Sequence, residues 1–478
     1  MTRSDRTSYA VGFADLDDEV AVEALPVTGI FPQWLSGTLL RTGPAKYDIG
    51  AMTVNHWFDG LAMLHRFAFD RGCVSYRNRF LRSDTFCESE QKGELARGGF
   101  ATDPCRTLFE RVAAVFRPTF TDNGNVSIDV FGGEVVALTE TTLPVCFDPE
   151  TLAVLGDRAY GAKVGGQISI AHPHHDVKRR RRYSYVVAFG RKSRYRLFSI
   201  ADEDGSERVV AEMGIDKPAY MHSFAMTERY LVLTEFPLVV DPLRLLLAGE
   251  PFIKNYRWTP ERGLRLHVFE KDGGRLVKSI ETDPVFAFHH VNAFEDGGAL
   301  VIDFVAYKDA TIIDQLYLAR LRAGEPVDAT GLLTRYVVPL EGSGEVTATR
   351  IGDTMIELPR IDYDRCAGKR YRYVWGVGRR TTGGFLDSVV KVDVETGAAQ
   401  TWWEEHCFPG EPVFVPAPGR TREGEGVLLS VVLDALRGRS FLLVLDAQTL
   451  EEVARAECPH LIPFGLHGSY LPQAHPGI

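Results

Sequence analysis

The sequence predicts an all-β protein, and three features of its patterning support this. Apolar segments are short and rich in Val, Ile, Phe and Tyr, as in Val126–Val130, Tyr185–Phe189 and Ala299–Phe304. Gly, Asp or Asn interrupts these segments at intervals of about ten residues, as expected for many short antiparallel strands. Long stretches of helical periodicity are almost absent. The third feature is a recurring turn.

This turn occurs in three segments that share one plan: Phe147–Leu152, Val392–Gly397 and Leu445–Leu450. In each, a strand ends at an Asp that can accept hydrogen bonds from its own backbone, and a Thr closes the turn before a return strand. Repeated strand–turn–strand units favour a β-propeller, in which radial repetition leaves only short protected edges. Stacked sandwiches would show the same periodicity, so pattern alone does not separate the two.

The chain is predicted to form one domain, residues 1–478, because no linker rich in Pro, Gly or Ser divides it. The best helix candidate is Asp103–Val112, with Asp103 as the N-cap and Pro104 at the first helical position.

Composition and charge exclude several classes of protein. The net charge of −10 argues against a nucleic-acid partner, which would require a basic face. The run Lys178–Arg182 is the exception, and we expect either a solvated turn or a contact with anionic lipid headgroups. Seven scattered cysteines without a C-x-x-C pair fit reduced thiols rather than a disulfide framework or zinc site. No secretory signal and no membrane-spanning run is evident, so we expect a cytoplasmic protein, soluble or peripheral to a membrane.

Four histidines in separate short contexts, each at a strand-to-loop junction, are the candidate metal ligands: His172, His222, His289 and His467. Imidazole suits iron, copper, nickel or zinc. A set of neutral histidines without thiolate or carboxylate favours Fe(II) that can bind dioxygen. The spacings are too long for a local motif, so a shared site and structural roles both remain open from these residues alone. The other nine histidines are expected to be structural or exposed.

Seven segments, in order along nearly the whole chain, resemble the motifs of the carotenoid cleavage oxygenase family. They are Asn55–His65, Ala171–Pro173, Met221–Glu228, Phe288–Ala293, Glu411–Pro416, Gly426–Leu433 and Leu466–Gly468. Thr102–Arg106, Trp57–Met63 and Asp362–Tyr363 are similar to the branch that contains the animal β-carotene oxygenases and the retinal pigment epithelium isomerohydrolase.

The resemblance implies a seven-bladed β-propeller with a cap of loops and short helices over an axial Fe(II). The ligands would be His172, His222, His289 and His467, because the motif places a ligand directly after Phe288 and so excludes His290. Glu140, Glu357 and Glu411 match the family's glutamates that orient ligand imidazoles. A carboxylate that accepts the distal N–H fixes the tautomer and raises ligand basicity.

The implied reaction adds both atoms of O2 across a conjugated C=C bond of a carotenoid or apocarotenoid and releases two carbonyl products, such as retinal-type aldehydes. The protein would supply metal electronics, substrate position and exclusion of water. Three alternatives stay open: a stilbene-type olefin dioxygenase, a retinoid isomerase, and a propeller used as a binding scaffold with structural histidines.

A lipophilic polyene substrate implies contact with a membrane surface. The segment Phe236–Gly249 concentrates large apolar residues, and the family has a nonpolar patch in the corresponding region. We expect an interfacial patch at the mouth of a substrate tunnel, with Arg244 and Lys254 reaching headgroups. A buried core helix is the alternative. The candidate patch residues are Leu238, Val239, Leu243, Leu245, Leu246 and Leu247.

Overall fold

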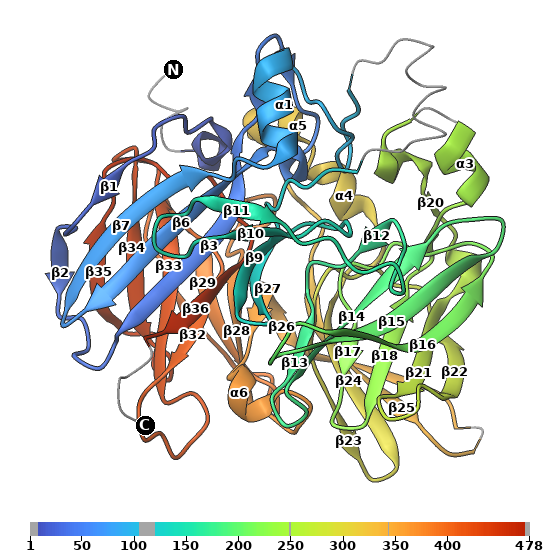
Figure 1. Ribbon diagram of the computed structural model, residues 1–478. Helices are drawn as coiled ribbons and strands as arrows, with labels where there is room; N and C mark the ends of the chain where they lie inside the picture. The colour runs from blue at the N-terminus through green and yellow to red at the C-terminus, as the bar shows by residue number, and fades with distance from the viewer. Residues whose placement is uncertain (1–7, 105–119, 248–249, 343, 474–478) are drawn as a thin grey trace.

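The computed structural model describes residues 8–104, 120–247, 250–342 and 344–473. Within these residues, the larger sheets number seven, have four to six strands each, and are arranged around a common axis (Figure 1). The protein is therefore a seven-bladed β-propeller, as predicted.

Blades 1 to 3 come from the first half of the chain, apart from one C-terminal strand. Blade 1 contains β1 (Ala21–Val22), β3 (Gly37–Lys46), β6 (Leu61–Asp70), β7 (Cys73–Phe80) and β36 (Gly468–Pro472). Blade 2 contains β8 (Ser127–Phe131), β9 (Glu134–Leu138), β10 (Val145–Phe147) and β11 (Val154–Asp157). Blade 3 contains β12 (Ile168–Ser169), β13 (His174–Asp176), β14 (Arg181–Ala188), β15 (Ser193–Ala201) and β16 (Glu207–Ile215).

Blades 4 to 7 follow in chain order, and one N-terminal strand joins the last. Blade 4 contains β17 (Ala225–Met226), β18 (Tyr230–Glu235), β21 (Leu264–Glu270) and β22 (Leu276–Thr282). Blade 5 contains β23 (His290–Asp296), β24 (Ala299–Ala306), β25 (Leu332–Pro339) and β26 (Thr347–Met355). Blade 6 contains β27 (Glu357–Arg360), β28 (Tyr373–Gly378), β29 (Ser388–Asp393) and β30 (Ala399–Trp402). Blade 7 contains β2 (Val27–Gly29), β31 (Cys407–Pro409), β32 (Val413–Pro416), β33 (Gly426–Asp434), β34 (Arg439–Asp446) and β35 (Glu452–Glu457).

The ring is closed twice by strands from opposite ends of the chain. In blade 1, β36 pairs antiparallel with β3, from Gly37 opposite Pro472 to Arg41 opposite Gly468. In blade 7, β2 pairs antiparallel with β35, from Val27 opposite Ala456 to Gly29 opposite Ala454. Closure of this kind joins the two ends of the chain into one ring and leaves only short protected edges.

Most of the short helices cap one end of the ring (Figure 1). They are α1 (Asp84–Lys92), α3 (Pro242–Leu247), α4 (Thr311–Gln315) and α5 (Leu318–Arg322), whereas α6 (Tyr363–Cys366) lies at the opposite end. Two small sheets, β4 (Asp48–Ile49) with β5 (Met52–Thr53) and β19 (Leu238–Val239) with β20 (Arg257–Trp258), complete the described strands. The predicted helix Asp103–Val112 falls mainly on residues outside those described.

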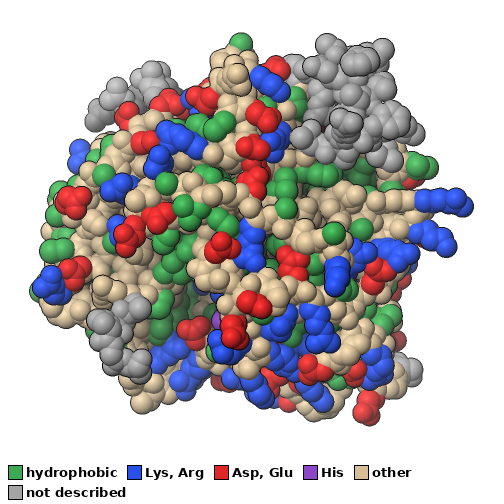
Figure 2. All heavy atoms as spheres, viewed as in Figure 1, with side chains coloured by type: hydrophobic (Ala, Val, Ile, Leu, Met, Phe, Trp, Pro, Cys, Tyr) green, Lys and Arg blue, Asp and Glu red, His purple; other side chains and the backbone are tan. Residues whose placement is uncertain are grey.

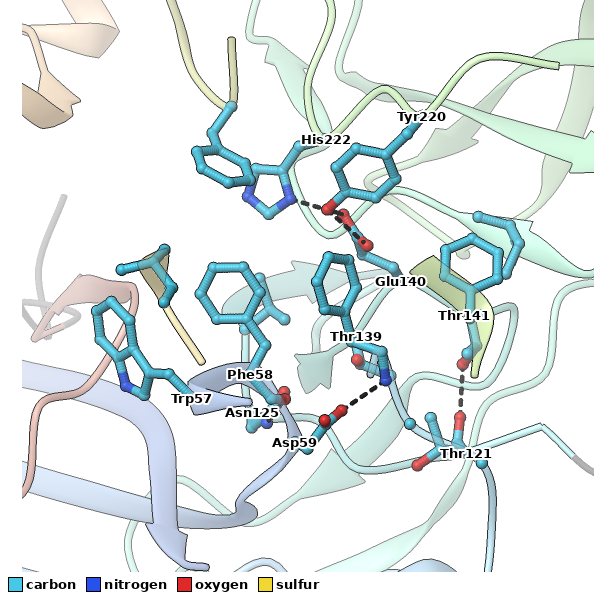
Figure 3. Close-up of a pocket in the computed structure, with 18 of the residues that line it drawn as sticks. Trp57, Phe58, Asp59, Thr121, Asn125, Thr139, Glu140, Thr141, Tyr220 and His222 are labelled. Carbon is cyan, nitrogen blue, oxygen red and sulfur yellow. Dashed lines mark hydrogen bonds and ion pairs between the residues drawn. The ribbon is translucent and has the colours of Figure 1, made fainter. Parts of the chain in front are cut away.

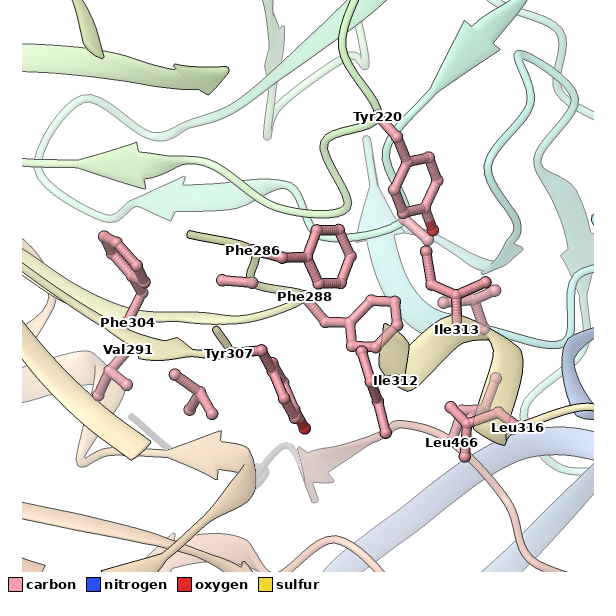
Figure 4. Packing of buried hydrophobic residues seen from close by; sticks show 14 of the residues in the cluster. Tyr220, Phe286, Phe288, Val291, Phe304, Tyr307, Ile312, Ile313, Leu316 and Leu466 are labelled. Atoms are coloured by element: carbon pink, nitrogen blue, oxygen red, sulfur yellow. The ribbon is translucent and has the colours of Figure 1, made fainter. Parts of the chain in front are cut away.

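Burial decreases from the middle strands of each blade to its outermost strand. The middle strand β24 is buried along nearly its whole length, because neighbouring blades pack against both of its faces. The outermost strand β22 instead alternates between half-buried and exposed positions. Between the ring and the cap, aromatic residues of blade 5 pack against Ile312 and Ile313 of α4 (Figure 4).

The recurring turn connects the third strand of a blade to the fourth in blades 2, 6 and 7. Asp148, Asp393 and Asp446 each accept hydrogen bonds from the backbone N–H groups two and three residues ahead, at 2.7–3.3 Å. The residue directly after the Thr of the turn has a positive φ: 60° at Leu152 and Leu450, 74° at Gly397. Both leucines are buried, so their packing offsets the cost of this conformation.

The basic run Lys178–Arg182 forms the turn between β13 and β14 and the start of β14. Arg179 pairs with Asp176 and Asp272, and Arg182 pairs with Asp129 and Asp202. Basic and acidic side chains also intermingle over the lower right of this face (Figure 2). The turn was correctly predicted. Ion pairs with carboxylates of the same chain neutralise much of its positive charge.

We expect Asp446→Ala to lower the free energy of unfolding by about 1–2 kcal/mol, because two backbone N–H groups lose their acceptor. Asp446→Asn keeps an acceptor oxygen and should cost less. Denaturant-induced unfolding measures both. Equal stability of Asp446→Ala and the unmodified protein would contradict the role assigned to the turn.

Candidate metal centre and its cavity

Each of the seven blades directs one polar side chain toward the axis. Blades 1, 3, 4 and 5 contribute His467, His172, His222 and His289, each located just before or between inner strands. Blades 2, 6 and 7 contribute the carboxylates Glu140, Glu357 and Glu411. The seven residues are far apart in sequence, and radial repetition of the blades brings them together.

The four histidines converge on one point. One ring nitrogen of each lies within 4.8 Å of those of the other three. The Nε2 atoms of His172 and His222 are 2.9 Å apart, and those of His289 and His467 are 3.1 Å apart. The structure therefore brings together all four histidines predicted as ligands.

A glutamate sets the tautomer of three of these imidazoles. Glu140 accepts a hydrogen bond from Nδ1 of His222 at 2.6 Å, and Glu357 accepts one from Nδ1 of His289 at 2.6 Å. Glu411 accepts from Nδ1 of His467 at 2.7 Å. Because an ionised carboxylate can only accept, Nδ1 carries the proton and Nε2 presents a lone pair to the axis. Among the described residues, His172 has no such carboxylate partner.

Each glutamate is held in turn by further donors. The Tyr220 hydroxyl donates to Glu140 at 3.0 Å, and the Tyr307 hydroxyl donates to Glu357 at 2.8 Å. Figure 3 shows Tyr220 and His222 both pointing toward Glu140. Glu411 instead accepts from Nε of Arg360 at 2.8 Å and from the backbone N–H of Gly468 at 2.9 Å.

Arg41 is a further donor to Glu411, at 3.4 Å. Of these donor side chains, only Tyr220 is close in the sequence to a predicted ligand, His222. Tyr307, Arg360 and Arg41 were missed, because no local pattern connects them to the histidines.

Electrostatics favour the neutral forms of His172 and His467 and the charged form of Glu411. Burial, reinforced by the neighbouring imidazoles, lowers the pKa of His172 well below its usual value. Burial also lowers the pKa of His467 to about 4, although Glu411 acts in the opposite direction. For Glu411, burial raises the pKa, but Arg360, His467 and Arg41 together bring it below the ordinary value.

This arrangement fits a metal ion. Nε2 of His289 and Nε2 of His467 face each other as lone-pair donors at 3.1 Å, which is repulsive unless a cation lies between them. With metal–nitrogen bonds of about 2.1 Å, two ligands at right angles would have nitrogens about 3.0 Å apart. The four imidazoles can thus share one ion, and nitrogen-only ligands suit iron, copper, nickel or zinc.

His290, next to His289 in the sequence, faces away from this centre. Its Nδ1 lies 2.7 Å from the Ser223 hydroxyl and its Nε2 lies 2.9 Å from the Thr234 hydroxyl. Both ring nitrogens are occupied, and burial lowers the pKa of His290 to about 3. The prediction that His289 and not His290 joins the other three histidines agrees with this geometry.

A second group of metal-ligating atoms, from Asp84, Asp122 and Asp157, has a different explanation. Arg97 pairs with Asp84 at 2.9 Å and with Asp122 at 3.6 Å. Asp122 also accepts from the backbone N–H groups of Asp84 and Thr85 at the start of α1. Asp84 and Asp122 therefore hold the start of α1 and Arg97 together.

A cavity of about 1060 Å³ extends from the metal centre through the capped end of the propeller. His222, His289 and His467 line it together with aromatic residues, including Trp57, Phe58, Phe100, Tyr220, Phe288 and Phe385. Its volume slightly exceeds the usual range for ligand sites, about 300–1,000 Å³. Three ligand histidines therefore face a large apolar cavity.

The predicted apolar patch is smaller than expected. Leu238 and Val239 belong to β19 and are only 6% and 5% exposed, so their assignment to a membrane-facing patch is wrong. They pair with β20 and pack in the core. Leu243 on α3 is 64% exposed and lines the cavity, and Leu245 is half-buried and lines it as well.

The side chains of Leu246 and Leu247 lie outside the described residues, so their part of the patch stays a prediction. No helix in the described parts of the chain is long and apolar enough to cross a membrane.

Comparison with known proteins gives matches along nearly the whole chain. The family described as retinal pigment epithelial membrane protein matches residues 13–472. Carotenoid isomerooxygenase of Galleria mellonella is 35% identical over 483 residues, covering 94% of this chain and 93% of that protein. The mitochondrial carotenoid-cleaving dioxygenase of Homo sapiens is 34% identical over 510 residues, covering 93% and 88%.

Solved structures show the same fold. A variant of the Synechocystis apocarotenoid oxygenase is 26% identical and covers 99% of both chains, with a TM-score of 0.86. A cobalt-substituted form of the Synechocystis protein matches with the same TM-score, identity and coverage.

We expect His289→Ala to weaken metal binding by more than about 100-fold, a larger loss than removal of a partner behind a ligand causes. His290→Ala is the matched control, since it removes the adjacent imidazole, which bonds only to Ser223 and Thr234. Metal content after dialysis and titration with divalent ions would measure the effect. Equal metal loss in both variants would contradict the assignment.

Proposed function

Because the chain belongs to the retinal pigment epithelial membrane protein family of carotenoid oxygenases, we propose that it is a non-haem Fe(II) dioxygenase. Its reaction would cleave a conjugated C=C bond of a carotenoid or apocarotenoid. The observation that carries this proposal is the convergence of four imidazoles, without thiolate or carboxylate ligands, beside a large aromatic cavity.

His172, His222, His289 and His467 would hold the ion. When bound, Fe(II) supplies the electrons that activate dioxygen toward an alkene. The overall reaction is balanced without a further reductant: one C=C bond and one O–O bond break, and two C=O bonds form. No proton enters or leaves, which fits a cavity where the polar groups near the axis are already paired with one another.

The protein's own residues position the substrate and exclude water. Phe58 and Phe288 lie 6.0 Å apart between ring centroids, and Phe288 is 5.6 Å from the His222 ring. Such aromatic walls offer a polyene extended apolar contact. Burial and Glu357 raise the pKa of Tyr307 well above its ordinary value, so this phenol stays protonated and holds the carboxylate in place.

The stilbene alternative is less well supported, because it would need Tyr and Lys groups to bind and ionise a phenol. Tyr220 and Tyr307 line the cavity. No lysine lines the cavity within the described residues. The isomerase alternative keeps one point in its favour, since one relative is named carotenoid isomerooxygenase. The double-bond configuration of the products would show whether isomerisation accompanies cleavage.

We expect Fe(II)-loaded protein to convert a carotenoid or apocarotenoid in detergent into two carbonyl products. Under ¹⁸O₂ each product should carry one labelled oxygen, as mass spectrometry would show after rapid work-up. His467→Ala should abolish conversion, whereas His290→Ala should retain it. Iron-independent conversion, or cleavage without label in either product, would refute the proposal.

We also propose that the protein takes its substrate from a membrane surface as a peripheral protein. The exposed Leu243 lies on α3 beside the cavity mouth, and the exposed cations Arg244 and Lys254 are close to it in the chain. A cytoplasmic location stays a prediction.

Leu243→Asp should lower binding to phosphatidylcholine vesicles by about tenfold, because an apolar side chain leaves the interface and a charge enters it. Leu436→Asp is a matched control: Leu436 is 63% exposed and lies in the β33–β34 hairpin of blade 7. Vesicle flotation measures both. An equal decrease in the two variants would argue against a specific patch at α3.

A further inference from the structure

The two ends of the cavity differ in exposure. Its exposed lining residues in the described chain all lie near blade 3 and α3: Gly190, Arg191, Asp216, Asp241, Leu243 and Glu250. At the end near blades 5 and 6, Val327 is buried and the other described lining residues are half-buried: Ala329, Met355, Arg379, Gly384 and Leu386. A ligand that enters at α3 therefore reaches a less exposed end of the cavity.

Arg379 is the charged residue at this less exposed end. Its guanidinium donates to the backbone carbonyls of Val327 and Asp328, the latter at 3.4 Å, and to the Thr330 hydroxyl at 2.9 Å. A β-bridge between Val327 and Gly383 holds the same segment. These contacts fix the guanidinium at the wall without neutralising it.

Within the described residues, no carboxylate lies within 4.0 Å of Arg379, since Asp328 offers only its backbone carbonyl. Arg97, a buried arginine that also lines the cavity, differs in this respect. It is 8% exposed and pairs with Asp84, Glu88 and Asp122. Arg191 also has no carboxylate partner in the described parts of the chain, but it lies in solvent at the mouth.

A half-buried cation beside an apolar cavity is costly unless it meets a hydrogen-bond acceptor. These contacts use only part of the five N–H donors of Arg379. A hydrocarbon end group would leave the remaining donors unpaired once it displaced water. A carbonyl or hydroxyl oxygen would accept a charge-assisted hydrogen bond at this position.

We propose that Arg379 is a specificity-determining residue that binds the oxygenated end group of the substrate. This inference rests on the proposed function and narrows the substrate class to polyenes with an oxygen function at one end, such as apocarotenals. The oxygenated end lies at Arg379, and the chain runs back past the histidines toward α3. The C=C bond that lies at the metal centre, and is cleaved there, is then determined by its distance from the oxygenated end.

The test is equilibrium binding to Fe(II)-loaded protein under anaerobic conditions, so that oxidative turnover does not enter. The two probes are an apocarotenal and a hydrocarbon polyene with the same number of conjugated double bonds. Quenching of tryptophan fluorescence provides the signal, because Trp57 lines the cavity. The quantity compared is the ratio of the two Kd values in the unmodified protein, Arg379→Met, Arg379→Lys and Arg380→Met.

The unmodified protein should bind the apocarotenal about 10- to 100-fold more tightly than the hydrocarbon, the range of one hydrogen bond to a charged group. Arg379→Met should bring the ratio close to one while the hydrocarbon Kd is unchanged, and Arg379→Lys should keep part of the preference. Arg380→Met is the matched control and should keep the full ratio, because Arg380 is exposed and stacks on Trp403 at 3.4 Å.

A ratio near one in the unmodified protein, or a full preference retained in Arg379→Met, would overturn the inference. Loss of hydrocarbon binding in Arg379→Met would report a damaged fold. In that case the Kd ratios of the unmodified protein and of Arg379→Lys test the inference. If the iron-loaded protein cleaves no polyene although the Kd ratio holds, the proposed reaction fails and the binding role of Arg379 stands.

Discussion

The repulsion among imidazole lone pairs at the propeller axis is the constraint on which the rest of the structure depends. Three glutamates hold the protons of three histidines on Nδ1 and so turn the Nε2 lone pairs toward one another. Without a cation this arrangement is unfavourable, because neutral acceptors face each other at about hydrogen-bond distance. A bound metal ion would therefore stabilise the site, and the three glutamates orient their histidines before an ion binds.

The seven-bladed ring provides the rigidity that such a site needs. Each blade supplies one of the seven inner residues, and strands from both ends of the chain close the ring in blades 1 and 7. The final strand, β36, begins directly after His467, so the same pairing that closes blade 1 also fixes one ligand. Buried donors then hold the carboxylates: Tyr220, Tyr307, and the arginines around Glu411. Fold stability and metal-site geometry are thus coupled.

Local features of the fold could be predicted from the sequence, whereas features that depend on the packing of distant segments could not. The turns at Asp148, Asp393 and Asp446 were predictable because their hydrogen bonds stay within three residues. The histidines and glutamates were found through ordered motifs, although no spacing rule brings blades 1, 3, 4 and 5 together. Arg360 and Arg41 could not be assigned, since they reach Glu411 only through the closed ring. Hydropathy alone wrongly predicted that Leu238 and Val239 are exposed in a membrane-facing patch. A buried strand and an exposed apolar patch have the same composition, so hydropathy does not separate them.

We propose that the four histidines bind one iron ion through Nε2. The most direct measurement is a crystal structure of protein loaded anaerobically with Fe(II), with anomalous diffraction recorded on both sides of the iron absorption edge. We expect a single iron peak on the axis within bonding distance of all four Nε2 atoms, with Glu140, Glu357 and Glu411 still bonded to the Nδ1 atoms. An empty axis under these conditions, or iron bound elsewhere on the protein, would contradict the account.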